Sequence, residues 1–383
     1  MAKNPELSIV MPCLNEEETL AICIEKANAF FETHKVEGEI IISDNGSTDK
    51  SIEIAQSLNA TVVHAKQKGY GNALKTGIEA ANGEFIIMGD ADDSYDFSNL
   101  MPYLDQLRKG FDLVMGNRFK GGIEDNAMPF LHKYLGNPVL SFIGRLFFKI
   151  KIGDFHCGLR GFSKSAYNRM NLKTTGMEFA SEMVVKSKLN GLSITEVPTT
   201  LKKDGRSRKP HLKTWSDGWR HLRFLMLYAP NWVFLYPGIL LVLIGLILGV
   251  FLLANPLKFE GITLDVHTLL YASAFLLVGV QFLIFYGLTK VFAVENELLP
   301  KSNRYNKLFH IINLERGLIL GFVLLLIGLF LSLESLSVWR DQNFGNLDVR
   351  STLRLVIPAI TCLQLGIQTI LFSFFFSILG LKK

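Results

Sequence analysis

The chain has 383 residues, of which 49% are hydrophobic and 20% are charged, with a formal net charge of +5. This composition is too apolar for an ordinary soluble enzyme and too charged for a simple membrane bundle, which indicates a soluble part and a membrane part. The length allows a full hydrophobic core, so intrinsic disorder and a disulfide-stapled miniature fold are excluded. The cysteines form no C-x-x-C pair, which argues against zinc-finger and redox motifs; they are Cys13, Cys23, Cys157 and Cys362.

Residues 1–210 alternate short apolar runs, rich in Val and Ile, with segments of helical period. This alternation predicts an α/β sandwich with a mostly parallel sheet, whose functional loops follow the carboxyl ends of the strands. The N-terminus lacks the regions of a signal peptide, so we expect this domain to stay in the cytoplasm. The predicted strands are Ser8–Met11, Glu39–Ser43, Thr61–His64, Phe85–Met88 and Asp112–Met115.

The composition changes after Tyr228, where apolar stretches of about 20 residues begin, a length that crosses a hydrocarbon core. Residues 234–383 are therefore predicted to form a transmembrane region with about four spans. Basic residues gather between the second and third spans and at the C-terminus, whereas the linker after the first span holds only Lys258. Arginines in the last linker weaken this bias without reversing it. The predicted spans are Phe234–Ala254, Leu269–Leu288, Gly317–Leu333 and Leu355–Leu379.

This distribution of basic residues also predicts the topology. By the positive-inside rule, both termini and the N-terminal domain are expected on the cytoplasmic side. The chain would then be a multi-pass protein of the cell membrane or of an endoplasmic-reticulum-type membrane.

Two stretches, residues 128–150 and residues 211–233, combine basic residues with aromatic and aliphatic residues at helical spacing. Helices of this kind lie on a membrane surface with their apolar face among the lipids, so we predict two interfacial amphipathic helices. The alternative is an amphipathic helix that packs on the sheet of the first domain.

The acidic segment Gly89–Asp93 directly follows a predicted strand. A strand that ends with carboxylates at alternate positions projects them from one side, close enough to hold a hard divalent cation. Asp90 and Asp92 are therefore predicted ligands of Mg²⁺ or Mn²⁺ in a site that could bridge a diphosphate. Acidic residues also occur in solvated turns and at helix N-caps, but the position at a strand end favours the metal site.

Another polar segment, Ser43–Asp49, follows the second predicted strand. A turn with a helix cap explains the later residues of this segment but does not explain Asp44. A carboxylate at this strand end can accept hydrogen bonds from a nucleobase or a ribose. The segment Gly69–Leu74 partly matches a dinucleotide-binding fingerprint, but its third glycine is missing and it follows the third strand. We expect Lys66, Lys68 and the flexible glycines to close over a phosphate group.

Positive charge recurs after the fifth predicted strand and in the first amphipathic stretch, at Arg118 and Lys133. Such groups suit either a phosphorylated lipid or simple adhesion to anionic headgroups, and for Arg118 substrate binding is the better interpretation. Nucleic acid is not expected as a partner, because the basic residues are interleaved with membrane-entry segments and no recognition motif is present. The histidines show no H-E-x-x-H spacing, which disfavours a zinc hydrolase.

Together, the motifs VMPCLNEE, ISDNGSTD, KGYGNA, GDADDS and GNRF resemble those of family 2 glycosyltransferases with the GT-A fold. Within this family the chain is similar to polyprenyl-phosphate glycosyltransferases, such as dolichol-phosphate mannosyltransferase and the bacterial enzymes that glycosylate undecaprenyl phosphate. The resemblance implies a UDP- or GDP-linked sugar as donor and a polyprenyl phosphate (dolichyl or undecaprenyl phosphate) as acceptor. A homo-oligomer is also compatible with it.

The resemblance further implies roles for individual residues. Asp90 and Asp92 would hold the metal and the diphosphate, Arg118 would bind the acceptor phosphate, and Asp92 and Arg118 would be the catalytic residues. From its place in the first amphipathic stretch, we also expect Lys133 to bind the acceptor phosphate. The nucleotide-sugar site would comprise Pro12, Leu14, Glu16, Ile42, Asp44, Lys68, Asp90, Ala91, Asp92, Lys202 and Arg208, the last two being basic residues that close it.

The sequence departs from the family pattern at two positions in the site. Many relatives continue the acidic motif as Asp-Leu-Gln-Asp-Pro, whereas Asp93 and Ser94 follow Asp92 here, so Ser94 or a water must replace a Gln ligand. Leu14 stands where relatives often carry a Tyr. These departures concern the metal geometry and the stacking of the base.

The predicted reaction is attack of a polyprenyl phosphate oxygen on the anomeric carbon of a nucleotide sugar, with inversion and release of a nucleoside diphosphate. A phosphate monoester is largely anionic at neutral pH and needs no general base, so catalysis depends on positioning and charge neutralisation. The alternative is transfer to a lipid hydroxyl, which needs a base such as Glu178 or Glu182. A processive polysaccharide synthase is disfavoured because the Q-x-x-R-W motif is absent, and an inactive scaffold because the acidic motif is intact.

Overall fold

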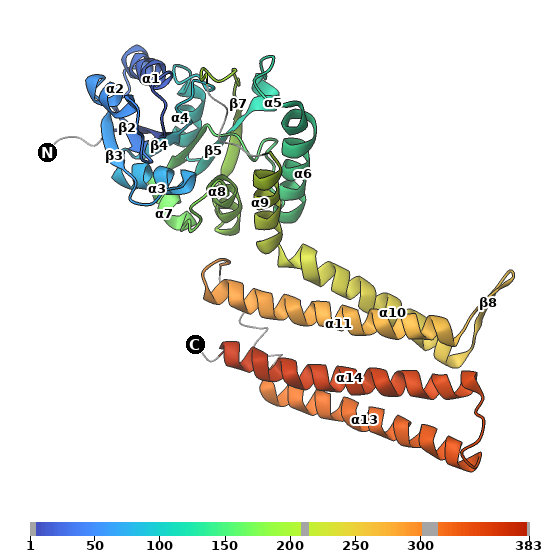
Figure 1. Ribbon diagram of the computed structural model, residues 1–383. Helices are drawn as coiled ribbons and strands as arrows, with labels where there is room; N and C mark the ends of the chain where they lie inside the picture. Colours follow the sequence, from blue (N-terminus) through green and yellow to red (C-terminus); the bar gives the residue numbers. More distant parts are fainter. Residues whose placement is uncertain (1–4, 208–213, 301–312, 381–383) are drawn as a thin grey trace. The chain divides into compact units, whose positions relative to one another are not determined.

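The computed structural model describes residues 5–207, 214–300 and 313–380 of the chain. The chain divides into two compact units, Met1–Tyr228 and Ala229–Lys383. The first unit contains a seven-stranded sheet with its helices, and the second contains long apolar helices (Figure 1). Arg208, one of the predicted site residues, lies outside the described residues.

The sheet of the first unit has the strand order β3-β2-β1-β4-β6-β5-β7. Its strands run parallel except for β6, which is antiparallel to both of its neighbours. The predicted strands are all present, which confirms the mostly parallel sheet, and β6 and β7 are additional to them. The strands are β1 (Leu7–Cys13), β2 (Gly38–Asp44), β3 (Thr61–His64), β4 (Phe85–Met88), β5 (Leu113–Asn117), β6 (Arg160–Ser163) and β7 (Ile194–Pro198).

Helices cover both faces of this sheet (Figure 1). Alternate side chains of β1 point to opposite faces. Leu7 and Ile9 join a core with residues of α1 and α4, whereas Val10 lies against Gly77 of α3. The parallel order places the loops after β1, β2 and β4 at one edge. The helices are α1 (Leu20–His34), α2 (Ser51–Ser57), α3 (Tyr70–Ala80), α4 (Met101–Arg108), α5 (Arg118–Gly121), α7 (Lys164–Met170) and α8 (Phe179–Leu189).

The first predicted amphipathic stretch forms η1 (His132–Gly136) and α6 (Asn137–Phe148), and α9 (Thr214–Leu227) packs against α6. One face of α6 packs on the domain, where Gly144 lies against the ring of Phe155. The rest of this region exposes large apolar side chains to the surroundings. We call them the apolar surface: Phe130, Leu131, Tyr134, Leu135, Val139, Phe142, Leu146, Trp215, Trp219 and Leu227.

The second unit contains two closely packed helix pairs, α10 with α11 and α13 with α14. Glycines let the backbones approach: Gly238 of α10 lies against Gly279 of α11, and Gly321 of α13 lies against Gly366 of α14. Four helices, namely η2 continued by α10, α11, α13 and α14, are long and apolar enough to cross a membrane, and each contains one of the predicted spans. The elements are η2 (Asn231–Leu235), α10 (Tyr236–Ala254), β8 (Leu257–Phe259), β9 (Ile262–Leu264), α11 (Val266–Glu295), α13 (Leu314–Asp341) and α14 (Val349–Gly380).

Candidate active site

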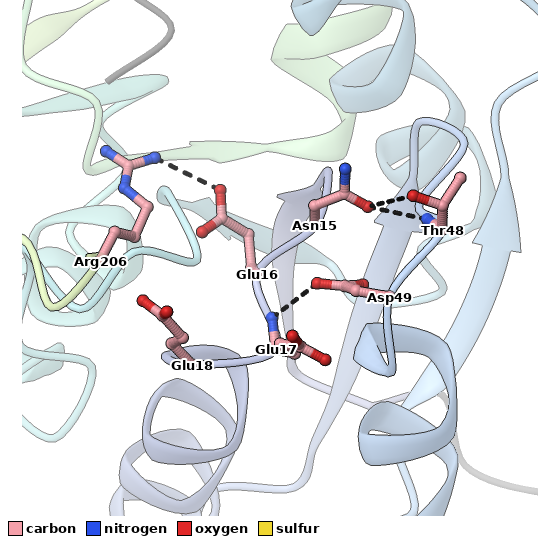
Figure 2. Close-up of a pocket in the computed structure, with 7 residues that line it drawn as sticks. All are labelled: Asn15, Glu16, Glu17, Glu18, Thr48, Asp49 and Arg206. Carbon is pink, nitrogen blue, oxygen red and sulfur yellow. Dashed lines mark hydrogen bonds and ion pairs between the residues drawn. The ribbon is translucent and has the colours of Figure 1, made fainter. Parts of the chain in front are cut away.

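A polar pocket of about 220 Å³ opens between the loops that follow β1 and β2 (Figure 2). Asn15 adopts a left-handed backbone conformation (φ 59°), which Asn tolerates better than most residues, and so turns the chain at the end of β1. Its side-chain oxygen accepts a hydrogen bond of 2.7 Å from the backbone N–H of Thr48, which ties the two loops together. The lining residues are Asn15, Glu16, Glu17, Glu18, Thr48, Asp49 and Arg206.

Asp44, at the end of β2, is buried and bonded to its own turn. Its carboxylate accepts hydrogen bonds from the backbone N–H groups of Gly46 and Ser47, and it lies 3.1 Å from the ring nitrogen Nδ1 of His64. Burial opposes ionisation of Asp44, but the hydrogen bonds from Ser47, His64 and Gly46 prevail and lower its pKa. The carboxylate therefore stays charged at neutral pH and shapes the turn beside the pocket.

Asp90 and Asp92 lie in the loop after β4, where sequence analysis expected them. Oδ1 of Asp90 accepts a 2.8 Å hydrogen bond from the hydroxyl of Tyr70, and Oδ1 of Asp92 accepts bonds from the N–H and hydroxyl of Ser94. Burial, followed by the negative charge of Asp92, raises the pKa of Asp90 to about 6. Ser94 thus orients Asp92 in this structure.

The two carboxylates fit a divalent cation. The negative charge of Asp92 raises the cost of ionising Asp90, and a cation with oxygen ligands would remove that cost. Among the described residues, no group of three or more His, Cys, Asp or Glu side chains could hold a metal ion. A cation held by Asp90 and Asp92 would therefore take its other ligands from water or from a bound phosphate group, as Mg²⁺ commonly does.

Arg206 is a site residue that sequence analysis missed. Its guanidinium donates to Oδ2 of Asp92 at 2.8 Å and contacts Glu16 at 3.3 Å, so it places a positive charge on the acidic motif (Figure 2 shows its bond to Glu16). The backbone N–H of Gly205 donates to the carbonyl of Asp92, and that of Lys202 to the carbonyl of Ser94. The segment 202–206 therefore covers the acidic loop, with Arg206 turned toward the carboxylates.

Arg118 is buried at the end of β5 and forms a paired hydrogen bond with Asp154. Its Nε lies 2.6 Å and its Nη2 2.9 Å from the two carboxylate oxygens, so two of its three nitrogens are committed to Asp154. Lys133 lies in η1, with its Nζ 5.7 Å from the centre of the Tyr134 ring. The two predicted acceptor-phosphate residues thus have different partners in the structure.

The remaining predicted donor residues occupy different environments. Pro12 and Leu14 are partly exposed around the end of β1, and Lys68 is exposed near the turn at Gly46. Ile42 and Ala91 are 1% and 3% exposed and belong to the hydrophobic core. The side chain of Ile42 therefore packs inside the domain rather than facing the pocket.

Glu182, one of two acids considered as a general base, is fully buried on α8. It accepts hydrogen bonds from the backbone N–H groups of Lys173 and Thr174 and forms a 3.0 Å ion pair with Lys186. The hydroxyl groups of Thr174 and Tyr228 also donate to it. Glu182 is thus an anchor for the chain at residues 173–174, and these partners oppose a role as a base.

Two family models match the chain. The model described as glycosyl transferase family 2 matches residues 8–170, and the one described as glycosyltransferase family 2 C-terminal transmembrane region matches residues 287–380. The first covers β1 through α7, including the acidic loop, and the second covers the end of α11 together with α13 and α14.

Several known proteins are similar to the chain. The low-salt glycan biosynthesis hexosyltransferase Agl6 of Haloferax volcanii is 36% identical over 98% of this chain and 89% of its own length. A dolichyl-phosphate hexose transferase of the same organism is 26% identical over 50% of this chain and 81% of its own length. A glucosyl-3-phosphoglycerate synthase structure from Mycobacterium tuberculosis is 20% identical, with a TM-score of 0.45 over 58% of this chain and 78% of that one.

Proposed function

The chain belongs to glycosyltransferase family 2, and we propose that this membrane glycosyltransferase moves a sugar from a UDP- or GDP-linked donor to a polyprenyl phosphate, with inversion. The observation that carries the proposal is the pair of carboxylates, Asp90 and Asp92, held at a strand end in a chain with four spanning helices. The name of the dolichyl-phosphate hexose transferase supports a lipid phosphate as acceptor.

The donor would bind at the edge formed by the loops after β1, β2 and β4. Asp90 and Asp92 would hold Mg²⁺ or Mn²⁺, which neutralises charge on the departing diphosphate when it is bound. Arg206 contacts Asp92 already and would move onto the diphosphate, because a phosphate group attracts a guanidinium as a carboxylate does. Glu16 would lie beside the nucleotide, next to Arg206.

The acceptor phosphate would attack the anomeric carbon directly, since it is already ionised at neutral pH. Arg118 would stabilise it with the guanidinium edge that Asp154 leaves free, while Asp154 keeps that group in a fixed orientation. Lys133 would reach the phosphate from η1, in the region that bears the apolar surface. No base is required, in agreement with the burial and pairing of Glu182.

The bilayer would hold the acceptor chain while its phosphate reaches the domain. The apolar surface suits contact with lipid, because a cluster of exposed aromatic and aliphatic side chains is costly in water. We propose that the first unit lies on the cytoplasmic side, together with both termini.

The proposal is tested by supplying the purified full-length protein with individual nucleotide sugars and a choice of lipid acceptors. The acceptors are a polyprenyl phosphate, the matching polyprenol and diacylglycerol, and the products are identified by mass spectrometry. We expect sugar on the polyprenyl phosphate alone, with nucleoside diphosphate released. Preferential glycosylation of either uncharged lipid would overturn the phosphate-acceptor proposal and favour transfer to a hydroxyl.

A further inference from the structure

The motif Lys68–Asn72 is hydrogen-bonded to two other segments of the first unit, one after β2 and one before α8. The N–H of Gly69 donates to the side-chain oxygen of Asn45, which follows β2. The N–H of Asn72 donates to the carbonyl of Thr175, in the segment that Glu182 anchors. A side chain at residue 69 or 71 would collide with Thr175, so the glycines permit this close approach. The contacts fix the position of Tyr70, at the start of α3.

The hydroxyl of Tyr70 points to the acidic loop. It donates a 2.8 Å hydrogen bond to Oδ1 of Asp90, across 20 residues of sequence. A tyrosine hydroxyl offers one proton, and here that proton fixes the rotation of the carboxylate. Asp90 therefore has one oxygen bonded to Tyr70.

The other oxygen of Asp90 faces a glycine. A Cβ atom at Gly158 would lie 2.6 Å from Oδ2 of Asp90, so only glycine leaves this oxygen its space. The hydroxyl of Tyr95 accepts a 2.8 Å hydrogen bond from the N–H of Gly158 and so fixes this backbone. The two oxygens of Asp90 thus have defined and different surroundings.

We propose that Tyr70 is a positioning residue for the divalent cation: its hydroxyl orients Asp90 so that the carboxylate meets the cation in one geometry. The inference rests on the proposed function, because it takes Asp90 as a metal ligand. Partners that orient a metal ligand typically change metal affinity by about 10- to 100-fold when they are removed.

The test compares Tyr70→Phe with Tyr103→Phe in the full-length protein. Tyr103 is a matched control, since its buried hydroxyl is hydrogen-bonded to Thr199 on another part of the domain. Mn²⁺ binding is measured by electron paramagnetic resonance, with UDP and with GDP, and thermal unfolding is measured without metal. We expect Tyr70→Phe to weaken Mn²⁺ binding about 10-fold or more and Tyr103→Phe to leave it unchanged.

A second readout separates positioning from a general loss of structure. In activity assays the defect of Tyr70→Phe should shrink as Mn²⁺ is raised toward saturation, whereas a structural defect would not respond to metal. Unchanged Mn²⁺ affinity in Tyr70→Phe, or equal weakening in both variants, would overturn the inference. If the unaltered protein bound no Mn²⁺ with either nucleotide, the metal assignment of the proposed function would fail first. A wrong acceptor assignment would leave the Mn²⁺ titration unaffected.

Discussion

Asp92 and Asp93 are neighbours in the sequence but have different partners, which provides a matched pair of variants. Asp92 contacts Ser94 and Arg206, whereas Asp93 bonds to Lys26 of α1 at 2.5 Å. We expect Asp92→Asn to lower kcat by more than about 100-fold. Loss of this carboxylate weakens binding of the cation, and the cation is what neutralises the charge that develops on the diphosphate. Asp93→Asn should keep kcat within about 3-fold, as expected for a change outside the reacting groups. Initial rates with a saturating donor measure this, and equal losses in the two variants would contradict the metal assignment.

The pKa of Asp90 predicts how pH and metal act on stability. Its pKa is raised from 3.8 to about 6, so between these values the folded chain binds more protons than the unfolded chain. The group therefore favours folding at acid pH, and this advantage is lost as the pH rises through about 6. A cation relieves the repulsion only when Asp90 is ionised, so Mn²⁺ with nucleotide should raise Tm more at about pH 7.5 than at about pH 5.

Thermal melts with and without Mn²⁺ at the two pH values check this expectation. Asp90→Asn is the control, since it has no charge to titrate and should show a small Mn²⁺ effect at both values. An equal rise in Tm at both pH values in the unaltered protein would show that cation binding does not depend on the ionisation of Asp90.

At the scale of elements, the apolar surface on η1, α6 and α9 predicts a dependence on acceptor chain length. Trp215 and Trp219 are 78% and 57% exposed, and indole rings favour the membrane interface. Replacing both with Ser should raise KM for a long polyprenyl phosphate about 5-fold or more, since about 1 kcal/mol of lipid contact corresponds to that factor. KM for a short, water-soluble analogue should stay unchanged. Ile22→Ser is the control, because this exposed apolar residue lies on α1.

Most elements of the fold could be predicted from the sequence because their apolar runs are regular. The strands β1 to β5 and the four membrane helices follow this rule. β6 and β7 escaped prediction because they carry residues such as Arg160 and Pro198, which weaken the strand pattern. Periodicity also cannot reveal that β6 runs antiparallel, since this depends on its partners β4 and β5.

The candidate site was predictable where a residue lies at the end of a strand, as Asp44 does, or just after it, as Asp90 does. Arg206 was not, because it lies in a run of basic residues without periodicity. Nothing in that run distinguishes Arg206 from Lys202. The side chain of Arg206 bonds to Asp92, whereas Lys202 contacts the acidic loop through its backbone N–H, which donates to the carbonyl of Ser94. The partners of buried charges could not be predicted either. Asp154 lies 36 residues from Arg118, and no local sequence pattern indicates that they pair.

For the molecule as a whole, the two units of the chain suit different environments, one aqueous and one lipid. The first unit carries polar groups that suit a water-soluble donor, and the second carries helices that suit a lipid environment. A transfer from a nucleotide sugar to a lipid phosphate must bring these two environments together. The side of the membrane on which the first unit lies therefore decides which donor pool the enzyme can use.

We expect the linkers after the first and third spans to lie opposite the first unit, because basic residues gather in the linker between the second and third spans. Labelling with a membrane-impermeant maleimide tests this in a Cys362→Ser background, since Cys13, Cys23 and Cys157 are buried. In intact cells, Lys258→Cys and Gln342→Cys should react, whereas Lys203→Cys, in the first unit, should react only after the membrane is permeabilised. All three positions are exposed in the structure, so differences in labelling report the side of the membrane. Labelling of Lys203→Cys in intact cells, with protection of the other two, would reverse the proposed topology and place the donor site outside the cytoplasm.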